Sequence, residues 1–344
     1  MRFDQELWLA AHQDSQDGNP RVVTRVKEVT PERRMLMATR KSASGFIWIV
    51  VALSLVQTGC GGAAPISQTP APSPGSSPNG QVRHVFIVVE ENHGYSSVLG
   101  NPDMTYLNGL ATTYAFAKGY YANTHPSIGN YFMLTAGQII TNDDGFSDIV
   151  TDDNIVRQLI KAGKTWKEYS EDLPSVGYTG GDTGGYTEHH NPLSYFSDVR
   201  NDSTQAQNLV PFSQFGTDLA NGTLPQYSFI VPNNDDDGHS GTLAQADSWL
   251  QANIDPLITS SDFKAARGGL LIITFDESGG SDSARGGGNV VWVVVGPGVK
   301  KGYSSTATYQ HESTLRLMCK MLGLTAFPGA AASAPDMGEF FSGN

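Results

Sequence analysis

Cysteine is almost absent from this chain of 344 residues, which contains only Cys60 and Cys319. A chain with so few thiols cannot depend on a disulfide framework, so its hydrophobic core must hold it together. Long apolar runs are missing as well, because the stretch at residues 45–56 is too short for a comfortable transmembrane helix. No internal repeat is found, which excludes solenoids and propellers.

Positive charge is also scarce. The chain has 22 Lys and Arg against 34 Asp and Glu, and residues 1–59 take eight of the basic and six of the acidic ones. The remainder therefore carries 14 basic and 28 acidic residues. A chain with this excess of negative charge lacks the basic surface that attracts nucleic acid. Its electrostatic attraction to anionic lipid surfaces would also be weak. We expect no nucleic-acid partner.

The amino-terminal segment has the pattern of an export signal. Arg40 and Lys41 precede the apolar stretch 45–56, and the small residues that follow end at Cys60. This order resembles a bacterial lipoprotein processing site, so we expect a signal peptide at 35–59 and a lipid on Cys60. The protein would then be exported and anchored at the cell envelope, in the periplasm or at the cell surface. The alternatives are plain secretion after cleavage nearby, or a retained anchor.

The remaining boundaries follow from composition. Met35 or Met37 is a natural start in front of a signal peptide, so we interpret residues 1–34 as an extension of the gene model. Residues 60–80 are rich in Pro, Ser, Gly and Ala, which is typical of a tether. Length alone allows one large domain or two ordinary ones after it.

The chain beyond the tether alternates between two periodicities. Helical spacing of apolar residues predicts helices at 154–162, 205–220, 242–257 and 311–322. Short apolar runs predict strands at 84–89, 165–169, 227–231, 270–275 and 290–295. Such alternation favours a mostly parallel sheet covered by helices on both faces, a three-layer α/β/α sandwich.

Two of the predicted strands end in acidic pairs. The run 84–89 leads into Glu90 and Glu91, and the run 270–275 leads into Asp276 and Glu277. Ligands of open α/β sheets bind beyond the carboxyl ends of the strands, and oxygen donors suit hard divalent cations. A cage of Glu91, Asn92, Asp276 and Glu277 is one interpretation; the other is that acidic residues simply begin solvated loops.

Ser127 stands directly before an apolar, helix-compatible run that stops at Gly137. Serine in this position is an ordinary helix N-cap, which satisfies a free backbone N–H. The same position also suits a nucleophile, because a helix start favours an anionic group such as phosphate and a nearby metal activates a hydroxyl. The local sequence leaves both interpretations open.

Six segments of the chain carry polar residues in a fixed order. They are Glu90 to Asn92; His125 to Tyr131; Glu188 to Pro192; Asn234 to His239; Thr274 to Glu277; and Tyr309 with His311, Ser313, Leu315 and Arg316. Together they resemble the bacterial phosphoesterase family, which contains metal-dependent acid phosphatases and phospholipases C with an alkaline-phosphatase-like fold. The match runs from about residue 84 to 324 and favours a single domain at 81–344.

The resemblance implies roles for nine of the matched residues. The family uses the serine of its Pro-Ser-x-x-Asn-Tyr motif as a covalent nucleophile, which here is Ser127. One divalent cation, whose identity the residues do not fix, is implied between the residues Glu91, Asn92, Ser127, Asp276 and Glu277. The phosphoryl group is implied between the residues Asn130, His189, His190 and His239. Histidine can supply positive charge and a proton for the leaving alcohol, while an amide donates hydrogen bonds without adding charge.

Three positions need separate interpretations. His125 and His311 are either part of the site or hydrogen-bonded structural histidines. Gly129 stands where the family commonly has proline, which removes no functional group. The acidic run 235–237 before His239 either binds a cation or forms a solvated turn.

These patterns lead to one expected function and two alternatives. We expect a phosphohydrolase that cleaves phosphomonoesters through a phosphoserine. A phospholipase C-type phosphodiesterase is the alternative within the enzymes, although serine at 127, where that branch often has threonine, favours the monoesterase. A surface lipoprotein that binds a phosphorylated ligand without turnover would need only some of the residues that occur together here.

Overall fold

A computed structural model of the chain describes residues 81–342. The expected gene-model extension, signal peptide, lipidated Cys60 and tether lie outside the described residues, so they stay predictions. Within 81–342, no helix has both the length and the apolar character that crossing a bilayer requires.

An eight-stranded sheet forms the middle of the domain, with the strand order β4-β3-β5-β1-β6-β7-β2-β8. Among the described strands β7 alone is antiparallel to its neighbours β6 and β2. The strands are β1 (His84–Glu90), β2 (Ala115–Tyr121), β3 (Trp166–Ser170), β4 (Leu209–Pro211), β5 (Tyr227–Val231), β6 (Gly269–Phe275), β7 (Trp292–Val295) and β8 (Tyr303–Gln310). The expected mostly parallel α/β fold is confirmed.

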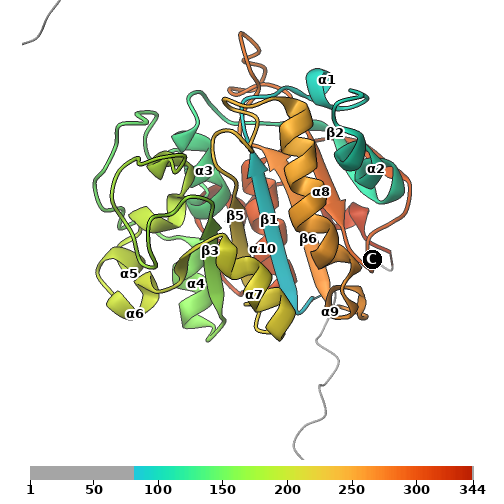
Figure 1. Ribbon diagram of the computed structural model, residues 1–344. Helices are drawn as coiled ribbons and strands as arrows, with labels where there is room; N and C mark the ends of the chain where they lie inside the picture. Colours follow the sequence, from blue (N-terminus) through green and yellow to red (C-terminus); the bar gives the residue numbers. More distant parts are fainter. Residues whose placement is uncertain (1–80, 343–344) are drawn as a thin grey trace, which may run out of the picture. The chain divides into compact units, whose positions relative to one another are not determined.

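Helices cover both faces of the sheet (Figure 1). Helices α7 and α8 lie in front of the sheet in this view, where α8 packs against α2, while α10 lies behind it and packs against α3. The longer helices are α2 (Thr105–Thr113), α3 (Ile128–Ala136), α4 (Ile155–Lys161), α7 (Ser213–Asn221), α8 (Leu243–Thr259) and α10 (His311–Met321). Single turns form α1 (Tyr95–Val98), α5 (Ser197–Arg200), α6 (Ser203–Ala206), α9 (Ser261–Lys264) and the 3₁₀ turns η1 (Glu188–His190) and η2 (Pro192–Tyr195).

The prediction of a single helix at 205–220 is wrong. The structure breaks this segment into α6, the short edge strand β4 and α7. Pro211 ends β4, and a proline disfavours the helical conformation of the residue before it and cannot donate the helical hydrogen bond. An edge strand tolerates the missing N–H.

Besides β4, two strands were not predicted because they are only partly buried. β2 and β8 pair with each other at the edge of the sheet, and exposed residues interrupt the apolar pattern of both. Their register shifts between Ala117 and Gly119. A side chain at Gly119 would meet the backbone oxygen of Ala307 at 2.6 Å, so glycine permits this close approach.

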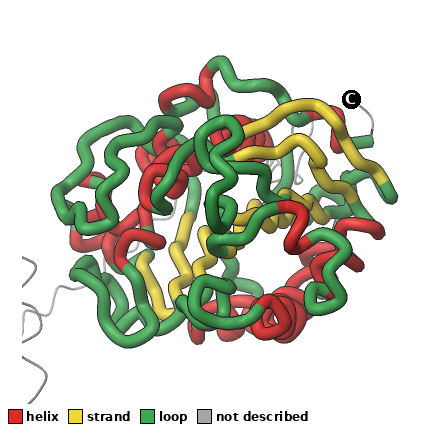
Figure 2. Tube along the Cα trace, turned by 90° about the horizontal axis from the view of Figure 1, so that it is seen from above, coloured by secondary structure: helices red, strands yellow, loops and turns green. Residues whose placement is uncertain are grey.

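The core strands β1 and β6 are buried along their whole lengths and lie side by side in parallel. Glu90 is level with Phe275 in this pairing, and the backbone N–H of Asp276 donates to the carbonyl of Glu90 at 2.9 Å. The residues that follow both strands therefore emerge together at one edge of the sheet, where loops gather in the view from above (Figure 2).

Candidate active site

The acidic residues that follow β1 and β6 meet, as the sequence predicted. Glu91 and Asp276 are both fully buried, which rules out the solvated-loop interpretation for these two carboxylates. Asn92 joins them, because its backbone N–H donates to Asp276 Oδ1 at 3.0 Å. Its φ of 56° is in the left-handed region, which asparagine tolerates better than most residues.

Ser127 lies where α3 begins, but its side chain does not cap the helix. The hydroxyl is nearly buried, with 4% of the residue exposed, and donates to Glu91 Oε2 at 3.3 Å. The cap position was therefore predicted correctly and the ordinary capping interpretation is wrong. A carboxylate from elsewhere, Asp144 Oδ1, accepts the N–H of Ile128 at 3.2 Å.

Glu91 is the centre of the polar contacts around Ser127. The hydroxyl of Tyr131 donates to Glu91 Oε1 at 2.8 Å, and Asn92 Nδ2 donates to Oε2 at 2.9 Å. His190 Nε2 lies 3.2 Å from Oε1, and His239 Nδ1 lies 3.5 Å from Oε2. Burial, followed by the charge of Asp276, raises the pKa of Glu91 well above its ordinary value.

The three histidines implied at the phosphoryl group are brought together. His190 is 1% exposed and stacks on Tyr131 with ring centroids 5.2 Å apart. His189 packs edge-on against His190 at 4.5 Å, and His239 lies 5.9 Å from His190 and is more exposed. Burial lowers the pKa of both His189 and His190 to about 4, which keeps their imidazoles neutral. A neutral imidazole can ligate a metal or exchange a proton.

The donor set fits a divalent cation. One ligand atom each from Glu91, His190 and His239 lies within 4.8 Å of the others. Asp276 Oδ2 is buried and has no hydrogen-bond partner among the described residues. A buried carboxylate oxygen without a partner is costly, and a cation would offset that cost. The structure thus groups Glu91 with two histidines, in addition to the expected acidic ligands.

Glu277 and Asn130 contact each other. Asn130 Nδ2 donates to Glu277 Oε2 at 3.3 Å, and His125 Nδ1 lies 3.1 Å from the same oxygen. Burial, then the charge of Asp276, raises the pKa of Glu277 to about 7. Asn130 is fully buried, and its Oδ1 accepts the backbone N–H groups of Asn123 and Thr124. Asn130 therefore also holds the loop before Ser127.

Two further residues support the site from behind. His311 Nε2 contacts the backbone oxygen of Asp276 at 2.6 Å, and its Nδ1 contacts Tyr120, which agrees with the structural interpretation of this histidine. Asp237 Oδ1 accepts the N–H of His239 at 2.7 Å, and Oδ2 lies 3.6 Å from His190 Nδ1. Asp237 is fully buried, so the solvated-turn interpretation of its acidic run is wrong at this position.

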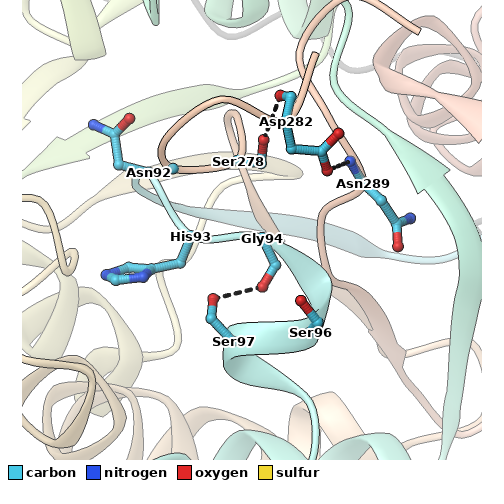
Figure 3. Close-up of a pocket in the computed structure, with 9 residues that line it drawn as sticks. Asn92, His93, Gly94, Ser96, Ser97, Ser278, Asp282 and Asn289 are labelled. Carbon is cyan, nitrogen blue, oxygen red and sulfur yellow. Dashed lines mark hydrogen bonds between the residues drawn. The ribbon is translucent and has the colours of Figure 1, made fainter. Parts of the chain in front are cut away.

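A cavity of about 440 Å³ adjoins Asn92, between the segment after β1 and the loop after β6 (Figure 3). Hydroxyl, amide, imidazole and carboxylate groups line it. The loop after β6 is braced there, since Ser278 donates to the backbone oxygen of Asp282 at 2.8 Å and the N–H of Asn289 donates to Asp282 Oδ2 at 3.0 Å.

Comparison with known proteins decides the family. The Phosphoesterase family model matches residues 101–325, well over half of the chain. This chain belongs to the phosphoesterase family. It is accordingly a hydrolase of phosphoester bonds, as the six sequence segments predicted.

Named phosphatases are among the relatives of this phosphoesterase. The phosphatidylinositol-3-phosphatase of Mycobacterium tuberculosis is 32% identical over 260 residues, which cover 75% of this chain and 82% of the relative. A probable acid phosphatase of Kluyveromyces lactis is 32% identical, and the acid phosphatase of Aspergillus fumigatus is 30% identical. The matches cover 68% and 70% of this chain but only 56% and 54% of these two fungal relatives.

Solved structures support the fold. A protein of the alkaline phosphatase superfamily from Vibrio parahaemolyticus has a TM-score of 0.53 at 11% identity, with 76% of this chain and 72% of that chain covered. The lipoteichoic acid synthase LtaP from Listeria monocytogenes has a TM-score of 0.52 at 9% identity, with 76% and 75% covered. The expected alkaline-phosphatase-like architecture is confirmed.

Proposed function

We propose that this phosphoesterase is an exported, metal-dependent phosphomonoesterase that works through a phosphoserine at Ser127. The observation that carries the proposal is the contact between Ser127 Oγ and Glu91 Oε2, made instead of a helix cap. The contact fixes the hydroxyl of the expected nucleophile against a residue from a different segment of the site.

Two steps account for the reaction. Ser127 Oγ loses its proton and bonds to phosphorus while the bond from phosphorus to the alcohol oxygen breaks, and that oxygen takes the electron pair and a proton. Water then attacks the phosphoserine, which releases phosphate and restores the hydroxyl of Ser127. His239 is the most exposed of the three clustered histidines, which suits it to pass protons between the leaving oxygen and solvent.

A divalent cation would be held by Glu91 and Asp276, with Asn92, Ser127 and Glu277 as the further ligands that the family resemblance implies. The grouping of His190 and His239 with Glu91 adds two nitrogen donors beside these oxygens. Bound there, the cation would supply positive charge to the phosphoryl oxygens and lower the pKa of the serine hydroxyl.

Two observations favour a phosphomonoester over a lipid diester. The cavity beside Asn92 is lined in part by Ser97, Ser278 and Asn289, whose hydroxyl and amide groups can bind a polar alcohol. The acid phosphatase relatives support the same choice. The alternatives are a phospholipase C-type phosphodiesterase and a non-catalytic surface lipoprotein that binds a phosphorylated ligand.

A substrate panel separates these functions. The metal-loaded protein is assayed with p-nitrophenyl phosphate, bis-p-nitrophenyl phosphate and phosphatidylcholine. Hydrolysis of the first alone supports the phosphomonoesterase, whereas faster hydrolysis of either diester contradicts it. Binding of inorganic phosphate with no turnover of any substrate would support the non-catalytic lipoprotein.

Export and the lipid anchor complete the proposal. We infer them from the basic pair, the apolar stretch 45–56 and the glycine before Cys60, in that order. The site described above does not depend on them, because all its residues belong to the domain that follows the tether.

A further inference from the structure

The start of α3 already holds an anionic group. We propose that Asp144 is a resident carboxylate that occupies the first backbone N–H of α3 in the free enzyme and gives way to a phosphoryl oxygen of substrate or product. The inference rests on the proposed function, because it gives the phosphoryl group a place between Ser127 and the clustered histidines.

The hydrogen bond at Ile128 is the first observation. Ile128 follows the expected nucleophile directly, and its N–H donates to Asp144 Oδ1 at 3.2 Å, while the hydroxyl of Ser127 donates to Glu91 instead of capping the helix. A helix start favours negative charge because its N–H groups and the helix dipole point toward the anion. A phosphoryl group attached to Ser127 Oγ would therefore lie beside the Ile128 N–H. In the free enzyme the carboxylate of Asp144 accepts that N–H.

The approach of the loop that carries Asp144 depends on Gly129. A side chain at Gly129 would lie 2.3 Å from Asn142 Oδ1 and 2.5 Å from Thr124 Cγ2, so the first turn of α3 leaves room for this loop only because it has glycine there. Asp143 Oδ1 accepts the N–H of Gly145 at 3.0 Å and tightens the turn around Asp144. The chain thus has glycine, where the family commonly has proline, at the position that the loop carrying Asp144 approaches.

The contact with Ile128, the residue after Ser127, places the Asp144 carboxylate at the phosphoryl side of the site. Its negative charge also makes a small contribution to the pKa shifts of His189, His190 and Glu277. His190 supplies a second sign of a ligand in the site: it is 1% exposed, and its ring nitrogens lie 3.2 Å from Glu91 and 3.6 Å from Asp237 without forming a hydrogen bond of good geometry to a described residue. A buried imidazole in this state suits a group that arrives with the substrate.

The consequence is competition between two anions. A dianionic phosphate must displace Asp144 from the Ile128 N–H and then remain near its charge, so the carboxylate weakens the binding of product phosphate. Asparagine in place of Asp144 can still accept the Ile128 N–H, but it lacks the charge. The substitution Asp144→Asn should therefore make the site bind inorganic phosphate more tightly without removing the contact that holds the loop.

Titration calorimetry of the full-length, metal-loaded protein with inorganic phosphate tests this inference. We expect Asp144→Asn to lower the dissociation constant of phosphate about tenfold, within the range of charge effects at helix ends. Asp148→Asn is the matched control, since it removes the same charge from an exposed residue a few positions along the chain, and it should change the constant by less than about twofold. Equal affinities for wild type and Asp144→Asn, or equal effects of the two substitutions, would overturn the inference.

A spectroscopic readout keeps the result independent of catalysis. In protein labelled with ¹⁵N-isoleucine, phosphate should shift the amide resonance of Ile128, because that N–H changes its acceptor. An Ile128 signal that stays unchanged at saturating phosphate would show that Asp144 keeps its place and would contradict the proposal. If the signal shifts in a protein that hydrolyses no ester, the proposed catalytic function fails while the inference about Asp144 stands.

Discussion

Ser127 Oγ and Glu91 Oε2 are joined by a hydrogen bond of 3.3 Å between residues that are 36 positions apart in the chain. The bond links the start of α3 to the end of β1 and leaves the first N–H of the helix to another acceptor. The proposed nucleophile is therefore held by the residue that also contacts Tyr131, Asn92 and two histidines.

Replacement of the nucleophile should stop turnover without unfolding the protein. Ser127→Ala is expected to lose nearly all activity on p-nitrophenyl phosphate, and wild-type protein quenched in acid during turnover should contain phosphoserine at this position by mass spectrometry. Ser248→Ala on the exposed face of α8 is the control and should behave like wild type. More than about a tenth of wild-type kcat in Ser127→Ala, a loss of only ~1.4 kcal/mol, would contradict the assignment.

Metal removal should abolish activity reversibly. Asp276 Oδ2 and the carboxylate of Glu91 are buried close together, and a cation relieves their repulsion. We expect chelation to inactivate the enzyme, a divalent cation to restore it, and Asp276→Asn to weaken both metal binding and turnover. Elemental analysis and calorimetry measure the metal directly, with the exposed Asp103→Asn as the control. Full activity in demonstrably metal-free protein would refute the mechanism.

Asp237 should act by positioning two histidines. Its Oδ1 accepts the backbone N–H of His239, and its Oδ2 faces His190 Nδ1. Asparagine has only one side-chain oxygen, so Asp237→Asn keeps an acceptor at one of these two places and should loosen the histidine at the other. We expect kcat to fall about 10- to 100-fold, as for other residues that orient site ligands, with a smaller change in KM. Asp235→Asn, an exposed neighbour in the same acidic run, should be close to neutral. The ¹⁵N chemical shifts of the His190 ring should change in Asp237→Asn, together with the fall in kcat, and should stay unchanged in Asp235→Asn.

Stability should decline toward alkaline pH because of a carboxyl group away from the site. Glu168 on β3 is 1% exposed and accepts the N–H of Leu193 at 3.0 Å, and burial raises its pKa to about 8 from an ordinary 4.5. The folded state thus keeps a proton that the unfolded chain releases. Its stabilising contribution is fully present below about pH 4.5 and is lost as pH rises through about 8.

Glu168→Gln should remove this dependence, because the amide has no charge to bury. We expect its Tm to exceed that of the wild type at about pH 9 and to match it at about pH 4, with each pKa unit worth about 1.4 kcal/mol. Thermal melts across the range measure the effect, and the exposed Asp103→Asn serves as the control. Parallel pH profiles for wild type and Glu168→Gln would show that Glu168 does not titrate as described.

The mature amino terminus should be Cys60 with a lipid attached, since a basic pair, an apolar stretch and a Gly-Cys junction occur in that order. Mass spectrometry of the protein produced in a bacterial expression host reads this directly. Cys60→Ser should release the enzyme from the membrane fraction and leave its specific activity unchanged. An unmodified terminus beyond residue 60 would mean that the enzyme is freely secreted.

The parts of the site that could be predicted from the sequence follow continuous apolar runs. The runs before Glu91 and Asp276 are long enough to indicate buried strands, and the run after Ser127 stops at Gly137, which has a φ of 69°. In each case the local pattern determines the element, and the element determines where the polar residue emerges. The family resemblance then added the chemistry.

Asp144 and Asp237 could not be found in this way. Each lies in a polar segment with no periodic signal, and each becomes significant only through a partner that is distant in the chain, Ile128 for the first and His190 for the second. Burial is what separates Asp237 from the exposed Asp235, two positions before it, and the identity of the residues does not encode that difference.

The pairing of β1 with β6 also limits when an active enzyme can exist. The contact between Asn92 and Asp276 closes a loop of 184 residues, and contacts of such high sequence separation form late because the chain must first lose the entropy of closing the loop. A chain that ends before β6 lacks Asp276 and Glu277 altogether. Phosphatase activity should therefore rise only with the last stage of folding, which makes it a direct assay of how much of the population has reached the native topology.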